Sequence, residues 1–185
     1  MARSVNVTIT DPSKGLQILL TGNWRRLDSL GEDIRAAIQR GYQKASLDFA
    51  NKLLRIVKKS LATGTPPPGV TWEPLSPATI KRWGQHPIYN LTGLYSRSVG
   101  LYQYKSRVLV GLPINNKRSS QRALTLNQLA KILEFGTADG RIPARPLWAP
   151  SLKAVGDKSA LKKTILLYIR RELAKYGIKP NQVKW

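Results

Sequence analysis

The chain has 185 residues, of which 42% are apolar, so it can build a sizeable core and lacks the composition of a disordered protein. Its 31 Lys and Arg face 10 Asp and Glu, and the formal charge of +21 favours a partner of opposite sign, such as nucleic acid, anionic lipid or an acidic protein surface. Because the chain contains no cysteine, disulfides and thiolate metal sites are excluded.

The first predicted elements are short strands. Residues Val5 to Thr10 alternate between β-branched and polar side chains, which is the period of a strand, and Leu16 to Leu20 offers a second short strand. The sequence before them lacks the long apolar stretch of a signal peptide, and no window approaches the roughly 18 apolar residues of a membrane span. We therefore expect a protein that is made and used in a cytoplasm, without a membrane partner.

A long amphipathic helix is predicted from Ser29 to Ala62. Ser29 is expected to cap its N-terminus, with Glu32 completing a capping box, and Gly64 with the prolines after it ends the helix. At 1.5 Å per residue such a helix is roughly 50 Å long. Its apolar face is expected to contain residues that recur every three or four positions: Leu30, Ile34, Ile38, Tyr42, Ala45, Phe49, Leu53, Ile56 and Ser60 or Leu61.

The rest of the chain is predicted to alternate loops, short helices and a hairpin. In chain order these are a loop (63–77), a short helix (78–83), two strands (94–104 and 108–112), a helix (125–135), a loop (137–150) and a closing helical region (150–176) with a break near Gly156. The core face of the closing region is expected to contain Leu161, Ile165, Leu166, Ile169 and Leu173.

This order predicts an α+β fold, in which a long N-terminal helix packs on a small antiparallel β-sheet with a β-hairpin and C-terminal helices. We expect residues 1–152 to form the α+β domain. Residues 153–185 are expected to add a C-terminal helix and tail to the same domain.

Enzyme chemistry has little support in the sequence. His86, the only histidine, precedes a proline in a predicted loop, and without cysteine it cannot build an ordinary zinc site or a Cys–His pair. The acidic residues are scattered, and the one adjacent pair, Glu32 and Asp33, is explained by the helix start. No phosphate-binding loop or dinucleotide fingerprint is present. We therefore expect a protein that is not an enzyme, with no metal and no cofactor, and we expect His86 to be a surface residue.

Basic residues are spread over the long helix, over a polar loop from Asn115 to Arg122 and over the region from Lys153 to Lys175. Within the loop, Lys117, Arg118 and Arg122 are candidates for contact with DNA or with an acidic partner. The aromatic residues are not interleaved with basic ones in any known reading module. A basic protein that binds DNA without sequence specificity is therefore the alternative to a structural role.

Two segments carry recognisable motifs. The first runs from Trp72-Glu73-Pro74-Leu75-Ser76 to Leu91-Thr92-Gly93-Leu94, and the second from Glu134-Phe135-Gly136-Thr137 to Ile142-Pro143-Ala144-Arg145-Pro146. In this order and spacing they resemble the phage virion-morphogenesis and tail-completion proteins, the minor tail proteins of Mu-like, lambda-like and HK97-like phages. The resemblance covers roughly residues 72–152.

The resemblance implies a structural virion protein of a tailed bacteriophage. Such a protein is a tail-completion, tail-terminator or neck subunit that caps the tail tube and joins the tail to the head. Its implied partners are further copies of itself in a ring, which is expected to be a hexamer, the tail tube and head-connector proteins, and packaged DNA in the lumen. Its implied location is the head–tail junction of the virion, and the host cytoplasm during assembly.

The motif residues are therefore the candidate site. Thr92 and Gly93 suit a tight turn, and Gly136 suits a helix end. Arg145 is expected either to pair with a carboxylate such as Glu134 or to contact another subunit. Two tryptophans, one in each segment, are core anchors or interface anchors. The full candidate set is Trp72, Leu75, Thr92, Gly93, Leu94, Glu134, Phe135, Gly136, Arg145, Pro146 and Trp148.

Overall fold

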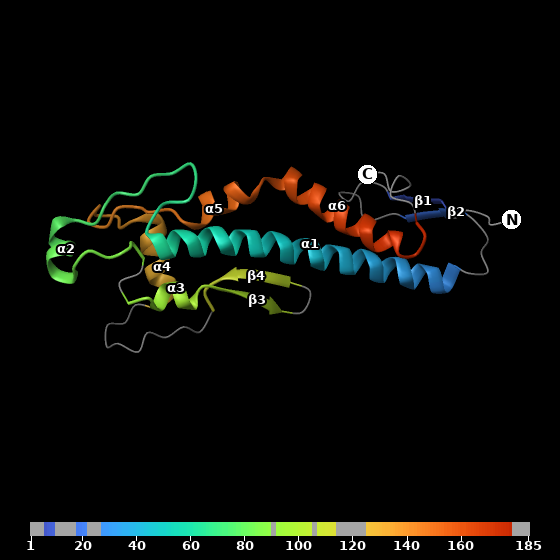
Figure 1. Cartoon of the computed structure of the whole chain (residues 1–185), viewed down its shortest axis with the longest axis horizontal. Coiled ribbons are helices and arrows are strands. Elements are labelled where there is room, and N and C mark those ends of the chain that lie inside the picture. The colour runs from blue at the N-terminus through green and yellow to red at the C-terminus, as the bar shows by residue number, and fades with distance from the viewer. Residues whose placement is uncertain are drawn as a thin grey trace. The chain divides into compact units, whose positions relative to one another are not determined.

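The computed structural model describes residues 6–9, 18–21, 27–89, 92–104, 107–113 and 125–178 (Figure 1). The chain is mostly helical and adds two antiparallel two-stranded hairpins, which confirms the predicted fold class. Its contacts group into two units: residues 1–46 with 158–185 form unit 1, and residues 47–157 form unit 2. The expected division after residue 152 stays a prediction. Among the described residues, no helix is both long and apolar enough to cross a membrane.

Helix α1 extends from Leu27 to Thr63 and contributes residues to both units. Its end is as predicted, because Gly64 adopts a φ of 70° and its N–H donates to the Ser60 carbonyl at 2.9 Å. The start of α1 differs from the prediction. The predicted cap, Ser29, lies inside the helix, and a residue within the first turn cannot act as the flanking N-cap.

Unit 1 contains the two predicted N-terminal strands. Strand β1 (Asn6–Ile9) pairs antiparallel with β2 (Ile18–Thr21), and Val7 lies opposite Leu20. Both strands lie within a few residues of their predicted bounds, and the alternating pattern identified the first of them.

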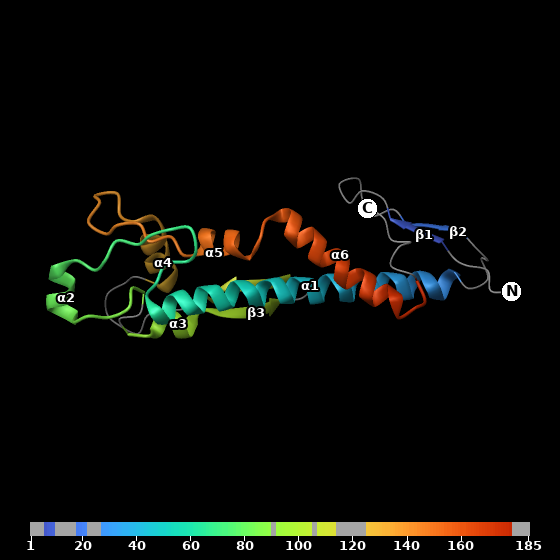
Figure 2. The same ribbon diagram turned by 45° about the horizontal axis from the view of Figure 1, so that its top comes forward.

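The core of unit 1 forms where α6 (Lys158–Ala174) runs beside the N-terminal part of α1 (Figures 1 and 2). A Cβ added to Gly41 would lie 2.7 Å from the Cα of Ile169, so the two helices touch at the level of the backbone. The predicted face placed Tyr42 inside, but this residue is half exposed because its small neighbour takes the contact. The buried core residues are Ile34, Ala37, Ile169, Leu173 and Ile178.

Unit 2 collects the rest of the core around the C-terminal part of α1. Strand β3 (Gly100–Tyr104) pairs antiparallel with β4 (Arg107–Gly111), which confirms the predicted hairpin. The buried residues of this core are Val57, Leu61, Tyr89, Tyr95, Val99 and Leu147. They come from α1 and from segments on both sides of the hairpin, so the core holds together parts of the chain that are far apart in sequence.

Two elements of unit 2 differ from the prediction. Residues Leu94–Ser98 form a short helix, α3, instead of the start of a strand, because Tyr95 and Val99 are four residues apart and both are buried on one side. Helix α5 (Trp148–Val155) begins inside the predicted loop. Pro150 is compatible with this start, since the first turn of a helix does not use its N–H groups.

The remaining helices follow the prediction. Helix α2 (Pro77–Trp83) is capped by Ser76, whose hydroxyl accepts the Thr79 N–H. Helix α4 (Leu126–Phe135) begins with a capping box between Thr125 and Gln128. The closing helical region is broken after α5 at Gly156, as expected.

Candidate interface at the motif segments

The loop that carries Trp72 is tied to the second motif. The indole N–H of Trp72 donates to the Pro146 carbonyl at 3.0 Å, and its ring lies 5.3 Å from the ring of Tyr89. Trp72 is partly buried against the core of unit 2. Trp72 therefore packs as a core anchor, and its role as an interface anchor stays a prediction.

Arg145 is buried, with only 6% of its surface exposed. Its guanidinium donates from Nε to the Glu73 carbonyl at 3.0 Å and from Nη2 to the Pro74 carbonyl at 3.1 Å. Within the part of the chain that the structure describes, no carboxylate forms an ion pair with it. The expectation that Arg145 pairs with Glu134 is therefore wrong, and Arg145 instead fixes the proline-rich loop through backbone carbonyls.

Glu134 caps helix α5 instead of pairing with Arg145. Its carboxylate accepts the backbone N–H of Leu147 at 2.8 Å and that of Trp148 at 3.2 Å. Helix α5 has no side-chain cap of its own at Leu147, so Glu134 supplies from α4 the acceptor that these N–H groups need. A carboxylate is also favoured at the positive end of a helix dipole.

Two tyrosines complete this network, and neither is in the candidate set. The hydroxyl of Tyr89 donates to the Arg145 carbonyl, and the hydroxyl of Tyr95 accepts the indole N–H of Trp148 at 3.3 Å. Burial raises the pKa of Tyr95 to about 12 and raises the pKa of Tyr89 further. Both phenols therefore stay neutral at physiological pH, and Trp148, like Trp72, is held as a core anchor.

The Thr92–Gly93 turn lies beside the same network. Gly93 adopts a φ of 68° and a ψ of −5°, the left-handed conformation expected for this position. The Thr92 carbonyl accepts a hydrogen bond from Arg97 at 3.1 Å. Leu75, Thr92, Leu94 and Arg145 line a common cavity of 190 Å³, so the first and second motif segments meet there.

His86 also lines this cavity and is half buried, which corrects the expectation of a surface residue. Its Nδ1 lies 3.0 Å from the carbonyl of Pro87, and its Nε2 is shielded from solvent. Over the described ranges of the chain, no group of three or more His, Asp and Glu lies close enough to hold a metal ion.

Gly136 is required by the geometry at the end of α4. It has a φ of 76°, and its N–H donates to the Ile132 carbonyl at 2.7 Å. A Cβ at this position would lie 2.8 Å from the Ile142 carbonyl oxygen. The backbone of the loop therefore passes directly over Gly136, and the predicted helix end at this residue is confirmed.

Phe135 is the one candidate motif residue with a large apolar side chain that faces solvent, with 78% of its surface exposed. Across the loop, Ile142 is also exposed, at 37%. Between them, Arg141 and Asp139 form an ion pair at 3.2 Å. This segment, residues 135–142, is called the Phe135 edge below. Phe135 and Ile142 thus present two exposed apolar side chains on one loop, and we take this loop as the candidate contact surface.

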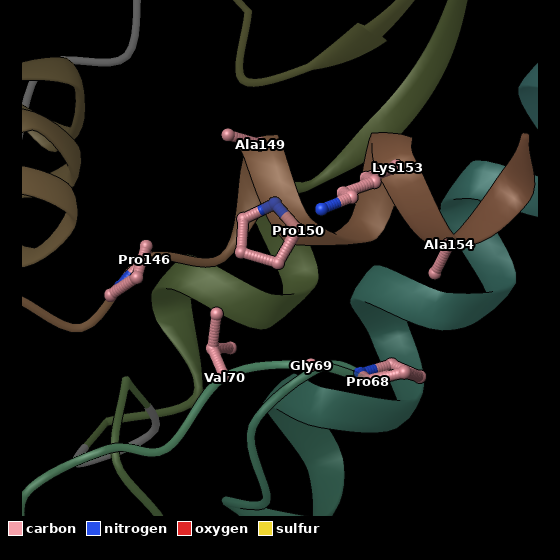
Figure 3. Close-up of a pocket in the computed structure, with 8 residues that line it drawn as sticks. All are labelled: Pro68, Gly69, Val70, Pro146, Ala149, Pro150, Lys153 and Ala154. Atoms are coloured by element: carbon pink, nitrogen blue, oxygen red, sulfur yellow. The ribbon is translucent and has the colours of Figure 1, made fainter. Parts of the chain in front are cut away.

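A shallow apolar groove lies nearby in unit 2, between the loop after α1 and the start of α5 (Figure 3). Its volume is 470 Å³, and Lys153 is its only charged residue. Pro146 joins this groove to the motif network. The lining residues are Pro68, Gly69, Val70, Pro146, Ala149, Pro150, Lys153 and Ala154.

The second group of candidate residues, Lys117, Arg118 and Arg122, lies outside the described residues. Their predicted contact with DNA or an acidic partner stays a prediction. In comparisons with known proteins, no family profile, no curated protein and no solved structure matches the chain. The resemblance to tail-completion proteins also stays a prediction.

Proposed function

We propose that the chain is a structural virion protein of a tailed bacteriophage, a tail-completion, tail-terminator or neck subunit. In this proposal copies of the protein form a ring, which caps the tail tube and joins it to the head. The ring subunits contact each other, the tail tube and the head-connector proteins, and packaged DNA passes through the lumen.

The observation that carries the proposal is the way the motif segments contact one another. Trp72 binds the backbone of Pro146, Arg145 binds the backbone of Glu73, and Glu134 caps α5. Through these contacts the motif residues fix the loops of the two motif segments against each other. Residues that fix a scaffold, with no cluster of catalytic groups among them, suit a protein whose product is an assembly.

The Phe135 edge is the part of this scaffold that we assign to assembly. Its apolar side chains gain by being removed from water, at roughly 25 cal/mol per Å² of buried surface. Large aromatic side chains at the centre of an interface often carry much of its binding energy. The ion pair between Asp139 and Arg141 leaves the edge locally neutral, so two copies can meet there despite their overall charge.

The first test is electron microscopy of particles from a phage whose copy of this gene carries a stop codon. Filled heads beside unattached tails would support a joining role, and overlong tails would support a length terminator. Normal, infectious particles would refute the structural role. They would direct attention to the alternative, a basic protein that binds DNA without sequence specificity.

A second test restores the gene from a plasmid and compares two matched variants. Phe135→Ser removes the exposed aromatic ring of the Phe135 edge, and Tyr42→Ser removes an aromatic ring with 51% exposure in unit 1. The proposal expects Tyr42→Ser to restore infectious particles and Phe135→Ser to fail, with both proteins folded by circular dichroism. Equal restoration by the two variants would remove the Phe135 edge from the assembly surface.

A further inference from the structure

Three cations in unit 1 converge on one buried carboxylate. Glu172 of α6 has a side chain that is only 5% exposed, and its Oε1 lies 2.6 Å from Lys44 Nζ and 2.8 Å from Lys175 Nζ. Its Oε2 lies 3.5 Å from Arg40 Nε. Hydrogen bonds from Lys175 and Lys44 lower the pKa of Glu172 to about 2. Arg40, Lys44 and Lys175 are called the cationic cluster below.

The cluster has more positive charge than Glu172 neutralises. One carboxylate balances one cation, and the dipole at the C-terminal end of α6 adds only about half a negative charge. The three cationic side chains are 43%, 51% and 59% exposed, so their remaining charge faces solvent. Among the side chains of unit 1 that the structure describes, the other acidic ones are those of Glu32 and Asp33 in the first two turns of α1, and neither forms an ion pair with the cluster.

The cations are also held in place before any ligand arrives. Lys44 and Lys175 share a single oxygen acceptor, so their ammonium groups must lie close together. Arg40 is fixed a second time, because its Nη2 donates to the hydroxyl of Tyr176 and its guanidinium lies 5.8 Å from that ring. These side chains have therefore already lost rotamer entropy in the folded protein, so binding a ligand costs them less entropy.

Hydrogen-bond donors remain on the cluster. An ammonium group carries three N–H donors and a guanidinium five. Glu172 and Tyr176 accept only some of these hydrogen bonds, so the partly exposed cations keep further donors for a ligand. A single cation would neutralise the charge of Glu172, and the cluster holds three.

We propose that the cationic cluster binds a phosphate group of a nucleic-acid backbone. Converging donors on fixed cations suit a compact anion with several oxygens, and phosphate is that anion in DNA and RNA. Neighbouring phosphates along the strand extend the attraction to other cations of α6, such as Arg171. The site needs no ring and no sequence readout, so it is independent of the assembly function proposed above.

The test compares two double variants of the full chain for binding to a short fluorescent DNA duplex by anisotropy, over a range of salt concentrations. Lys44→Gln with Lys175→Gln removes two cluster charges and leaves Arg40 to pair with Glu172. The control removes the same charge from two exposed lysines of α1 in unit 2, Lys58→Gln with Lys59→Gln. The cluster variant should lose affinity and lower the slope of log K against log salt by about 1, because the contact with one phosphate is lost.

The control variant, Lys58→Gln with Lys59→Gln, should keep most of the wild-type slope of log K against log salt. Equal losses in the two variants, or no loss in the cluster variant, would overturn the proposal, since binding would then depend on total charge alone. Both variants are checked for folding by circular dichroism.

A measurement on the wild-type protein covers the case of a cluster variant that does not fold. Lysines are acylated with and without the duplex, and the modified sites are read by mass spectrometry. The proposal expects DNA to protect Lys44 and Lys175 more strongly than Lys58 and Lys59. Uniform protection, or equal protection of the cluster by polyglutamate at matched charge, would refute a phosphate site.

Discussion

Glu134 offers the sharpest test of how the motif scaffold is held together. In Glu134→Ala the N–H groups of Leu147 and Trp148 lose acceptors at 2.8 and 3.2 Å. Hydrogen bonds to charged groups are worth about 1.5–3 kcal/mol each, and loss of a helix cap typically costs about 1 kcal/mol. Water can replace part of this, because Glu134 and Trp148 are only half buried. We expect a loss of about 3 kcal/mol in the free energy of unfolding of unit 2.

For a chain of this length the loss corresponds to a fall in Tm of about 6–12 °C. Tryptophan fluorescence during urea unfolding reports on the region directly, since Trp72 and Trp148 belong to the same network. Glu134→Gln is the control, because the amide keeps one acceptor oxygen and the shape of the side chain, and it should lose about half as much. A loss below about 0.5 kcal/mol for Glu134→Ala would refute the capping role, since changes of that size are ordinary for surface positions.

Three further predictions concern stability and are checked by urea or thermal unfolding. Gly136→Ala should lower the free energy of unfolding by about 2 kcal/mol, because of its φ of 76° and the close Ile142 carbonyl. Gly140→Ala, with a φ of 70° and open space around it, should lower it less. Equal losses would show that the Ile142 carbonyl contributes nothing beyond the backbone strain. Gly41→Ala should destabilise unit 1 by about 1–3 kcal/mol, while Gly31→Ala, in open space on the same helix, should stabilise it by about 0.5–1 kcal/mol. Because the pKa of Glu172 is lowered to about 2, its ion pairs stabilise the protein above about pH 4.5, and this contribution should be lost as pH falls towards 2. Glu172→Gln should be less stable at neutral pH and show a weaker acid dependence, and an unchanged acid profile would contradict the assignment.

Local patterns in the sequence predicted most elements of the fold. Strand β1 follows from alternation, and the C-terminal ends of α1 and α4 and the break at Gly156 follow from glycine, which acts within a few positions of the chain. The buried face of α1 was less well predicted. The pattern favoured large residues such as Tyr42, but the contact with α6 is made at Gly41, because a small residue allows the closest approach of two helices.

In the candidate site, too, contacts between distant parts of the chain could not be predicted from local patterns. The motifs identified Glu134 and Arg145 as candidate residues, and their opposite charges suggested an ion pair. The structure instead satisfies each charge with backbone groups, and these partners depend on where the loop after α4 runs. The contacts of Tyr89 and Tyr95 and the cationic cluster around Glu172 were missed, because most of the partners involved lie between 53 and 136 residues apart in the chain, Lys175 and Glu172 being the exception.

The charge of +21 and the exposed apolar side chains suggest that different surfaces of this protein serve different partners. Like-charged copies repel, but at physiological salt the repulsion is screened beyond about 8 Å, so it acts mainly where surfaces touch. The Phe135 edge avoids this repulsion, because Asp139 and Arg141 neutralise each other between its apolar side chains. Two copies that met at the cationic cluster would repel each other, since Glu172 holds the surplus positive charge of the cluster in place. We infer that copies of the chain meet at the Phe135 edge, and that the cluster is left for an anionic partner.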